Sequence, residues 1–303
     1  MPEIQSILVT GANGQLGRSL KAIISDYPQY AVTFANREML DLSKPSSIEA
    51  FFKINTFDLI INCAAYTAVD KAESEPKLAD AINHLAVKQL AKIAAQQQAK
   101  LIHISTDYVF NGQQFRPCVE TDEVDPQGVY GQTKLAGEQA LLQEMPINAL
   151  IIRTSWVYSE YGNNFVKTML RLGAERESLS VVCDQVGAPT YAGDLARAIM
   201  TIAASEQFKQ EGINSQLYHY SNEGVCSWYD FAKAIFEKNG INCQVLPIET
   251  KDYPAPAKRP HYSVLNKNKV KNLYKVGVPY WKEALQLCLQ RLNGNKLDSE
   301  LNP

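Results

Sequence analysis

A glycine-rich loop at residues 11–17, with the sequence GANGQLG, constrains the fold of this 303-residue chain more than any other feature. The loop follows a short apolar run at residues 7–10 and opens a run with helical spacing at residues 16–24. Glycines in that context permit a tight turn and let backbone N–H groups approach a pyrophosphate at the N-terminus of the helix. The spacing G-x-x-G-x-x-G differs by one residue from the G-x-G-x-x-G fingerprint, and a purely structural turn is the alternative. We therefore predict a dinucleotide-binding turn with the candidate residues Gly11, Asn13, Gly14, Gln15, Leu16 and Gly17.

Strand-like and helix-like patterns alternate through the first half of the chain. Further apolar runs typical of buried strands lie at residues 31–34, 58–63, 101–105 and 149–153. Apolar residues recur at helical spacing at 78–93, and 130–142 also has a helical pattern. Such alternation predicts an α/β fold of the Rossmann type, a doubly wound parallel sheet covered by helices on both faces. In this fold the ligand binds at the carboxyl ends of the strands.

The second half of the chain is less regular and predicts a smaller, discontinuous lobe. Helical patterns cover residues 163–172, 191–203, 228–238 and 281–292, and one more strand is predicted at 217–220. Ser227 is suited to cap the helix that starts at Trp228, and Trp228 and Trp281 are expected to anchor the core or an interface. We predict a dinucleotide-binding domain of residues 1–157 and 189–224, a substrate-binding lobe of 158–188 and 225–295, and a tail of 296–303.

Charge and composition argue against several classes of protein. The formal charge of −2 is not that of a general nucleic-acid binder, which would carry a basic patch. The start of the chain lacks the pattern of a signal peptide, and no apolar run approaches the roughly 18 residues that span a bilayer. The six cysteines and four histidines are scattered without the spacing of metal ligands, so no metal site is predicted. We expect a cytoplasmic protein with reduced thiols and no nucleic-acid or membrane partner.

Tyr130 and Lys134 are the strongest candidates for catalysis. They stand four residues apart on a predicted helix and therefore share one face. Because an ammonium beside a phenol favours the phenolate, we expect Lys134 to lower the pKa of Tyr130 from its usual value near ~10. Such a tyrosine can pass a proton to or from a carbonyl or alcohol oxygen. Thr106, preferred over Ser105 at the end of a predicted strand, can hydrogen-bond a substrate carbonyl, and a strand-end cap is the alternative.

The residues after the second predicted strand bear on the choice of cofactor. An acidic residue at this place binds the ribose 2′-hydroxyl of NAD, whereas an arginine accommodates the 2′-phosphate of NADP. Asn36 and Arg37 stand there, which favours NADPH, with NADH as the alternative. A solvated surface arginine is the plainer interpretation, and Glu38 is adjacent. Asp41 and Leu42 are then expected near the adenine.

Longer stretches of the sequence resemble one known family. They are NCAAYTAVDKAE at residues 62–73, STDYVF at 105–110, VYGQTKLAGE at 129–138, RTSWVY at 153–158, GNNF at 162–165, DQVGAPT at 184–190 and RP at 259–260. With the glycine loop and the Tyr-x-x-x-Lys pair, they resemble the extended short-chain dehydrogenase/reductase superfamily and, within it, the dTDP-4-dehydrorhamnose reductase family. The resemblance spans nearly the whole chain.

This resemblance implies an activity and a set of site residues. The activity is reduction of the C4 ketone of dTDP-4-dehydro-β-L-rhamnose by NADPH or NADH, which yields dTDP-L-rhamnose, a donor for cell-surface polysaccharide. Thr106 would position the ketone, Tyr130 would protonate O4, and Lys134 would bind the nicotinamide ribose and tune Tyr130. The segment expected beside the cofactor comprises Ala64, Ala65, Tyr66 and Thr67. The residues expected at the dTDP-sugar are Thr67, Val69, Thr106, Asp107, Trp156 and Arg259.

Several alternatives stay open from the sequence. Sugar 4,6-dehydratases of this fold commonly carry Asp-Glu after the hydroxyl residue, but Tyr108 follows Asp107 here, which favours simple reduction. An epimerase, a reductase of another 4-keto-6-deoxy sugar nucleotide, and a non-catalytic regulatory subunit like the methionine adenosyltransferase beta subunit are the alternatives. Arg259 can pair with a diphosphate through its planar fork or be a surface arginine.

The resemblance does not extend to a metal site or settle the assembly. Some relatives use Mg²⁺ through glutamates at a dimer contact. Ser19 and Gly193 stand where two of these glutamates would align, so no Mg²⁺ is expected. The oligomeric state is open, with a homodimer as one alternative.

Overall fold

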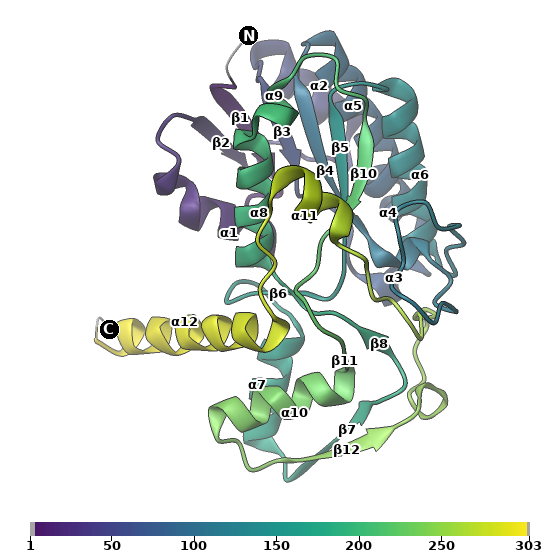
Figure 1. Cartoon of the computed structure of the whole chain (residues 1–303), viewed down its shortest axis with the longest axis vertical. Coiled ribbons are helices and arrows are strands. Elements are labelled where there is room, and N and C mark those ends of the chain that lie inside the picture. The colour runs from purple at the N-terminus through teal and green to yellow at the C-terminus, as the bar shows by residue number, and fades with distance from the viewer. Residues whose placement is uncertain (1–3, 302–303) are drawn as a thin grey trace.

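A six-stranded parallel sheet forms the centre of the upper part of the molecule in this computed structural model, which describes residues 4–301 (Figure 1). Its strand order is β10-β5-β4-β3-β1-β2, and every neighbouring pair is parallel. The strands are β1 (Ser6–Thr10), β2 (Ala31–Ala35), β3 (Leu59–Asn62), β4 (Lys100–Thr106), β5 (Ala149–Thr154) and β10 (Gln216–His219). The order reverses beside β1, so the carboxyl ends of β1 and β3 border the crevice in which such sheets bind ligands.

Helices cover both faces of the sheet because successive strand residues point to opposite sides. Ile7 and Val9 pack in one core with α1 (Gln15–Ile23), α8 (Ala192–Ala204) and α11 (Asn268–Tyr274). Leu8, between them, belongs to a second core, built with α2 (Pro45–Ile54), α5 (Ala86–Gln96) and α6 (Val129–Glu144). The fold is therefore the doubly wound Rossmann type that the alternating sequence pattern predicts.

Short helical segments connect these elements. The helix predicted at 78–93 is a run of α4 (Pro76–Asp80), a π-helical turn at Ala81–Leu85 and α5. The other short elements are α3 (Val69–Ala72), α9 (Glu206–Lys209) and three 3₁₀ turns at Ile24–Asp26, Asp107–Val109 and Thr250–Asp252. Asn83 lies in this π turn, and its side chain contacts the Tyr66 backbone and the Thr133 hydroxyl.

A smaller lobe lies below the sheet in Figure 1. The lobe elements are α7 (Phe165–Glu175), β7 (Ser178–Val182), α10 (Trp228–Asn239), β12 (Gln244–Ile248) and α12 (Trp281–Leu301). The lobe core joins α7, α10 and α12 around Phe231, Ile235 and Trp281, all at most 2% exposed. Strand β12 pairs in parallel with β7. Two short pairs, β6 (Val157–Tyr158) with β9 (Thr190–Tyr191) and β8 (Val186–Gly187) with β11 (Cys226–Ser227), complete the strands of the described chain.

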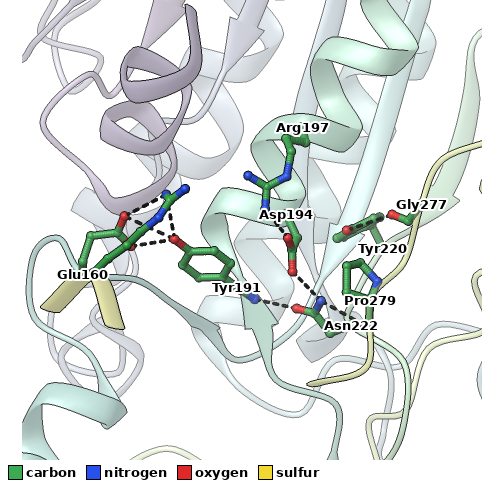
Figure 2. A network of polar contacts seen from close by, with 9 residues as sticks. Glu160, Tyr191, Asp194, Arg197, Tyr220, Asn222, Gly277 and Pro279 are labelled. Carbon is green, nitrogen blue, oxygen red and sulfur yellow. Dashed lines mark hydrogen bonds and ion pairs between the residues drawn. The ribbon is translucent and has the colours of Figure 1, made fainter. Parts of the chain in front are cut away.

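A buried polar network joins the lobe to helix α8 (Figure 2). The Tyr191 hydroxyl donates to the Glu160 carboxylate at 3.0 Å, and Arg291 of α12 donates to that hydroxyl at 3.0 Å. The Tyr191 backbone N–H donates to the Asn222 side chain at 2.7 Å, and Asn222 donates in turn to Asp194 at 2.7 Å. Because Glu160, Tyr191, Asp194 and Asn222 are buried and satisfy each other's hydrogen bonds, they fix the start of α8 against the lobe.

The predicted elements of the second half are largely present. Residues 217–220 overlap β10, and Ser227 caps α10 in a capping box with Asp230. The predicted end of the last helix at residue 292 is wrong, because α12 continues to Leu301 through Asn293 and Gly294. Glycine in a helix costs only about 1 kcal/mol relative to alanine, so it does not have to end one. Residues 302–303 of the predicted tail lie outside the described residues, and the predicted domain division stays a prediction.

No helix within residues 4–301 combines the length and apolar character needed to cross a membrane.

Candidate active site

A cavity of about 780 Å³ lies at the carboxyl ends of the central strands. It gathers residues that are far apart in the sequence, from the glycine loop to the segment after β5. Predicted site residues in its lining are Gly11, Gly14, Gln15, Leu16, Arg37, Asp41, Leu42, Ala64, Ala65, Tyr66, Thr67, Val69, Thr106, Asp107, Tyr130, Lys134 and Trp156. Gly17 and Arg259 do not line it, and Asn13 and Asn36 line an adjoining cavity.

The glycine loop has the close backbone contacts that a dinucleotide site requires. Gly11 has a φ of +66°, and a Cβ there would lie 2.8 Å from the Ala64 backbone nitrogen. A Cβ on Gly17 would lie only 2.4 Å from the Gly11 carbonyl oxygen, so this glycine lets α1 start against the turn. Gly14 is the N-cap residue of α1, and no side chain caps the helix. The free N–H groups of the first turn of α1 are therefore available to a phosphate, and the loop fits a dinucleotide.

The adjoining cavity, of about 550 Å³, lies beyond the end of β2. Arg37 and Lys44 both line it and both contact the Asp41 carboxylate, at 3.5 and 3.4 Å. The Arg37 side chain is 73% exposed, so it is free to turn towards a ligand. Asn13, Asn36, Glu38 and Ser47 complete this lining. Two cations beside polar side chains suit a phosphate on the adenosine ribose, with Asp41 and Glu38 as opposing charges.

The catalytic candidates meet on α6 and β4. Tyr130 and Lys134 both line the main cavity, and the Tyr108 ring packs edge-on to Tyr130 at 5.4 Å. The Glu73 carboxylate accepts from the Val129 backbone N–H at 2.9 Å, which ties down the first turn of α6. Thr106 ends β4 and accepts from the Tyr108 backbone N–H at 3.2 Å. The strand end and the helix start thus present Thr106 and Tyr130 to the same cavity.

The expected lowering of the Tyr130 pKa is wrong for this structure. Burial raises the pKa of Tyr130 to about 12, against a hydrogen bond with Thr106 that lowers it. Lys134 donates instead to the Ile104 carbonyl oxygen at 2.6 Å. Burial also lowers the pKa of the Lys134 ammonium to about 8, which the Glu138 carboxylate opposes. The pKa of each group is therefore set mainly by its loss of hydration, and not by the attraction that their four-residue spacing led us to expect.

A buried polar chain behind Lys134 is not evident from the sequence. His103 Nε2 lies 3.4 Å from Lys134 Nζ, and His103 Nδ1 lies 3.0 Å from the Asn62 side-chain amide. The Thr10 hydroxyl donates to Asn62 at 2.6 Å. Burial and the neighbouring Lys134 hold the His103 pKa well below its usual value, so the imidazole is neutral. These residues sit at matching positions of β1, β3 and β4, a juxtaposition that only the strand order reveals.

Asp107 is a buried carboxylate in the cavity wall. It is 1% exposed, and its Oδ1 accepts from the Thr106 hydroxyl at 3.0 Å. Its Oδ2 has no partner with hydrogen-bond geometry in the described part of the chain, although the Ser263 hydroxyl is near enough to lower the Asp107 pKa in part. Burial raises the pKa of Asp107 to about 6. An unpartnered polar atom in a cavity wall is suited to a polar ligand group, such as a sugar hydroxyl.

Asn83 of the π turn is a second residue that sequence reasoning missed. Its side chain accepts from the Tyr66 backbone N–H at 2.9 Å and donates to the Tyr66 carbonyl oxygen at 3.1 Å. It also donates to the Thr133 hydroxyl on α6 at 3.2 Å. Asn83 therefore joins the segment beside the cofactor turn to the catalytic helix. A lone asparagine in an apolar helical pattern was the only available signal.

Arg259 lies beside the site rather than in its wall. Its guanidinium donates to Asp70 at 2.7 Å, and the Ala257 backbone N–H donates to the same carboxylate at 3.2 Å. Asp70 is the first charged residue of α3, just after the cavity residues Thr67 and Val69. The ion pair thus fastens the loop before Pro260 to the cavity segment.

Gln15 connects the glycine loop to the segment after β5. Its amide donates to the Val157 carbonyl oxygen at 3.2 Å and accepts from Ser159 at 2.9 Å and Asn164 at 3.0 Å. Val157 and Asn164 themselves line the cavity. The cofactor turn and this segment are therefore held together by one side chain.

Comparison with known proteins identifies the family. The model of the family described as RmlD substrate binding domain matches residues 5–293. A dTDP-4-dehydrorhamnose reductase of Aggregatibacter actinomycetemcomitans is 42% identical over 289 residues, which cover 92% of this chain and 97% of that protein. The chain belongs to the dTDP-4-dehydrorhamnose reductase family.

Solved structures agree with membership of the dTDP-4-dehydrorhamnose reductase family. The crystal structure of such a reductase from Clostridium acetobutylicum has a TM-score of 0.89 and 41% identity, covering 95% of this chain and 100% of that one. The reductase of Bacillus anthracis, solved in complex with NADP, has a TM-score of 0.89 and 38% identity, covering 95% and 99%. The Rossmann-type fold and the family resemblance of the sequence are thereby confirmed, whereas the roles of single residues stay predictions.

Proposed function

We propose that this protein reduces the C4 ketone of dTDP-4-dehydro-β-L-rhamnose to dTDP-L-rhamnose with NADPH. The observation that carries the proposal is the presence of Thr106, Tyr130 and Lys134 in the same cavity as the glycine turn, in a member of this family. Bound NADPH supplies the hydride that adds to C4. The complex of the B. anthracis relative with NADP, together with Arg37 and Lys44 in the adjoining cavity, supports NADPH over NADH.

Tyr130 is the proton donor in this proposal. A pKa of about 12 keeps its phenol protonated at neutral pH, so the proton is available when the ketone is reduced. The alkoxide that forms at O4 is far more basic than a phenolate and takes this proton. The Thr106 hydroxyl donates to Asp107 before substrate binds; it then turns its proton to the ketone oxygen and orients the ketone towards Tyr130.

Lys134 lies next to Tyr130 on the same face of α6 and binds the nicotinamide ribose in this proposal. Its ammonium stabilises the phenolate that is left after proton transfer. This attraction between opposite charges is strong because the site is buried and little water screens it. The Ile104 carbonyl holds the ammonium at 2.6 Å, which fixes its position before the substrate arrives. Thr67, Val69, Asp107 and Trp156 line the sugar-nucleotide end, with Arg259 close by.

We also propose where the protein acts and with which partners. The substrate is a soluble sugar nucleotide, and the protein acts on it in the cytoplasm without a nucleic-acid or membrane partner. A homodimer is the assembly to test first. Among the described residues, no group of three or more histidine, cysteine, aspartate or glutamate side chains could hold a metal ion.

The experiment that tests the function follows NADPH oxidation with freshly generated dTDP-4-dehydro-L-rhamnose and identifies the product sugar. Formation of dTDP-L-rhamnose is the expected result. Tight NADPH binding with no turnover of this or any related 4-keto-6-deoxy sugar nucleotide would overturn the proposal and favour a regulatory subunit. Tyr253→Phe, at a half-exposed tyrosine outside the cavity lining, serves as the control for substitutions of Tyr130.

A further inference from the structure

Trp156 has an unusual backbone for a large side chain. Its φ is +48°, in the left-handed region that residues with a Cβ rarely adopt. It stands between β5 and β6 and lines the main cavity. A strained residue of this kind persists only where the surrounding structure holds it, and such residues cluster at binding sites.

The support for Trp156 is an aromatic stack. The Trp228 ring lies 3.6 Å from the Trp156 ring, centroid to centroid, at an interplanar angle of 10°. The Phe165 ring lies 4.6 Å from Trp228. Trp156 lines the cavity but Trp228 and Phe165 do not, so Trp228 backs the indole from the side of the lobe and Phe165 packs in turn against Trp228.

Both backing rings stand on firmly held backbone. Trp228 is the first residue of α10, where Ser227 and Asp230 form a capping box. Phe165 is the first residue of α7, where the Asn164 side chain caps the helix. Capped helix starts have fixed entry angles, so the rings have little freedom to move away from Trp156.

Gly187 provides the space for the indole. A Cβ at this position would lie 2.7 Å from Trp156 Cε2 and 2.8 Å from Cζ2. It would also lie 2.9 Å from the Ser263 hydroxyl oxygen. Real Cβ atoms do not approach so closely, so any larger residue here would displace the indole edge.

We propose that Trp228 is a positioning residue for the sugar nucleotide: with Gly187, it holds the Trp156 indole in the cavity wall, ready to contact the sugar. The inference rests on the proposed function for the identity of the ligand. The stack covers one face of Trp156 and Gly187 borders the edge at Cε2 and Cζ2, while the residue still lines the cavity. Preorganisation of this kind improves affinity because the side chain need not be ordered on binding.

Circular dichroism tests the stack without any ligand. The chain has three tryptophans, and only Trp156 and Trp228 are stacked on each other. Stacked indoles couple electronically and give an exciton couplet where their in-plane transition dipoles are rotated against each other, so Trp228→Phe and Trp156→Phe are expected to change the circular dichroism of the coupled rings. Trp281→Phe, at the third tryptophan, is expected to keep it. Spectra of Trp228→Phe and Trp156→Phe that differ from wild type no more than the Trp281→Phe spectrum does would overturn the inference.

Calorimetry tests the consequence for binding. Titrations of dTDP-L-rhamnose and of dTDP alone into the NADP⁺ complex are compared for wild type, Trp228→Ala, Trp228→Phe and Gly187→Ala. Loss of a stacked aromatic pair corresponds to an affinity loss of about threefold to tenfold. We expect that loss for dTDP-L-rhamnose in Trp228→Ala and Gly187→Ala, a return to within about twofold of wild type in Trp228→Phe, and unchanged dTDP and NADP⁺ affinities.

The outcomes separate this inference from the proposed function. An unchanged affinity for dTDP-L-rhamnose in Trp228→Ala, with the circular dichroism of the coupled rings changed, would show that Trp228 does not position Trp156 for the sugar. Equal losses for dTDP and dTDP-L-rhamnose would also overturn the inference, because they would indicate a general loosening of the lobe. If Trp228→Ala does not fold, Gly187→Ala decides the matter: an unchanged affinity for dTDP-L-rhamnose in that variant would overturn the inference. A wild type that binds neither nucleotide refutes the proposed function, whereas circular dichroism still reports on the stack.

Discussion

Replacement of Asp107 by asparagine is expected to stabilise the protein at neutral pH. Asp107 is 1% exposed, and its Oδ2 has no hydrogen-bond partner among the described groups. Burial raises its pKa from the usual 3.8 to about 6, so at neutral pH the folded state carries an unfavourable buried charge. A rise from 3.8 to about 6 corresponds to roughly 3 kcal/mol. The asparagine N–H group that takes the place of Oδ2 would cost about 1 kcal/mol if it stayed unpaired, which leaves a net gain of about 2 kcal/mol.

The pH dependence of this gain follows from the direction of the pKa change. Below about pH 4 the carboxyl is protonated in both the folded and the unfolded state, so the substitution brings no relief from charge. Between about pH 4 and pH 6 the folded wild type holds its proton while the unfolded chain loses it, and the stability of the wild type falls as pH rises. Above about pH 6 the full difference between variant and wild type is present.

Urea unfolding of Asp107→Asn and wild type from pH 4 to pH 8 measures this difference. The control is Asp184→Asn, because hydrogen bonds from Thr250 lower the Asp184 pKa although burial opposes them. The control should lose stability at neutral pH, where Asp107→Asn gains it. A difference between Asp107→Asn and wild type that is constant with pH, or a destabilisation at pH 8, would refute the assignment of a buried, unpaired charge.

Other substitutions test separate parts of the structure. Tyr130→Phe should lower turnover by about 10²-fold or more through loss of the proton donor, with NADPH affinity unchanged by fluorescence titration; a near-normal rate would exclude the proposed role. Arg37→Ala should weaken NADPH by about 1.5–3 kcal/mol and NADH much less, and equal losses would remove the 2′-phosphate contact. Glu138→Gln should destabilise the fold by about 3–5 kcal/mol, measured by urea unfolding, because it leaves the buried Arg153 without its charge partner. The Arg153 guanidinium lies 2.6 Å from the Glu138 carboxylate. A cost below about 1 kcal/mol would contradict the buried pair.

The sequence predicted the parts of the fold that depend on local pattern. The apolar runs at 7–10, 101–105 and 149–153 are strands of the sheet because buried parallel strands are continuously apolar. Ser227 was predicted as a cap because a serine directly before a helical pattern is a local signal, and the structure adds Asp230, which completes a capping box. Helix α2, strands β7 and β12 and helix α11 were not predicted. Strand β12, with the sequence QVLPI, alternates polar and apolar residues only weakly and so gives little signal of a strand.

The candidate site was predicted in its members but not in its energetics. Tyr130 and Lys134 could be selected by their spacing and Thr106 by its place at the end of a predicted strand, and all three line the cavity. The direction of the Tyr130 pKa could not be predicted, because it depends on desolvation that only the folded structure creates. His103 and Asn83 were missed because their hydrogen-bond partners Lys134 and Thr133 are 31 and 50 residues away in the sequence.

The hydrogen bonds of Gln15 have a thermodynamic consequence for the two ligands. The backbone of Gln15 belongs to the turn that fits the cofactor pyrophosphate, and its side chain hydrogen-bonds Val157 and Asn164 in the segment after β5. If the cofactor steadies that segment, it raises the affinity of the cavity for the sugar nucleotide by some factor. Reciprocity then requires the sugar nucleotide to raise the affinity for the cofactor by the same factor. The Gln15 amide would then carry part of the coupling free energy between the two ligands, and replacing it would lower both affinities in the ternary complex by the same factor.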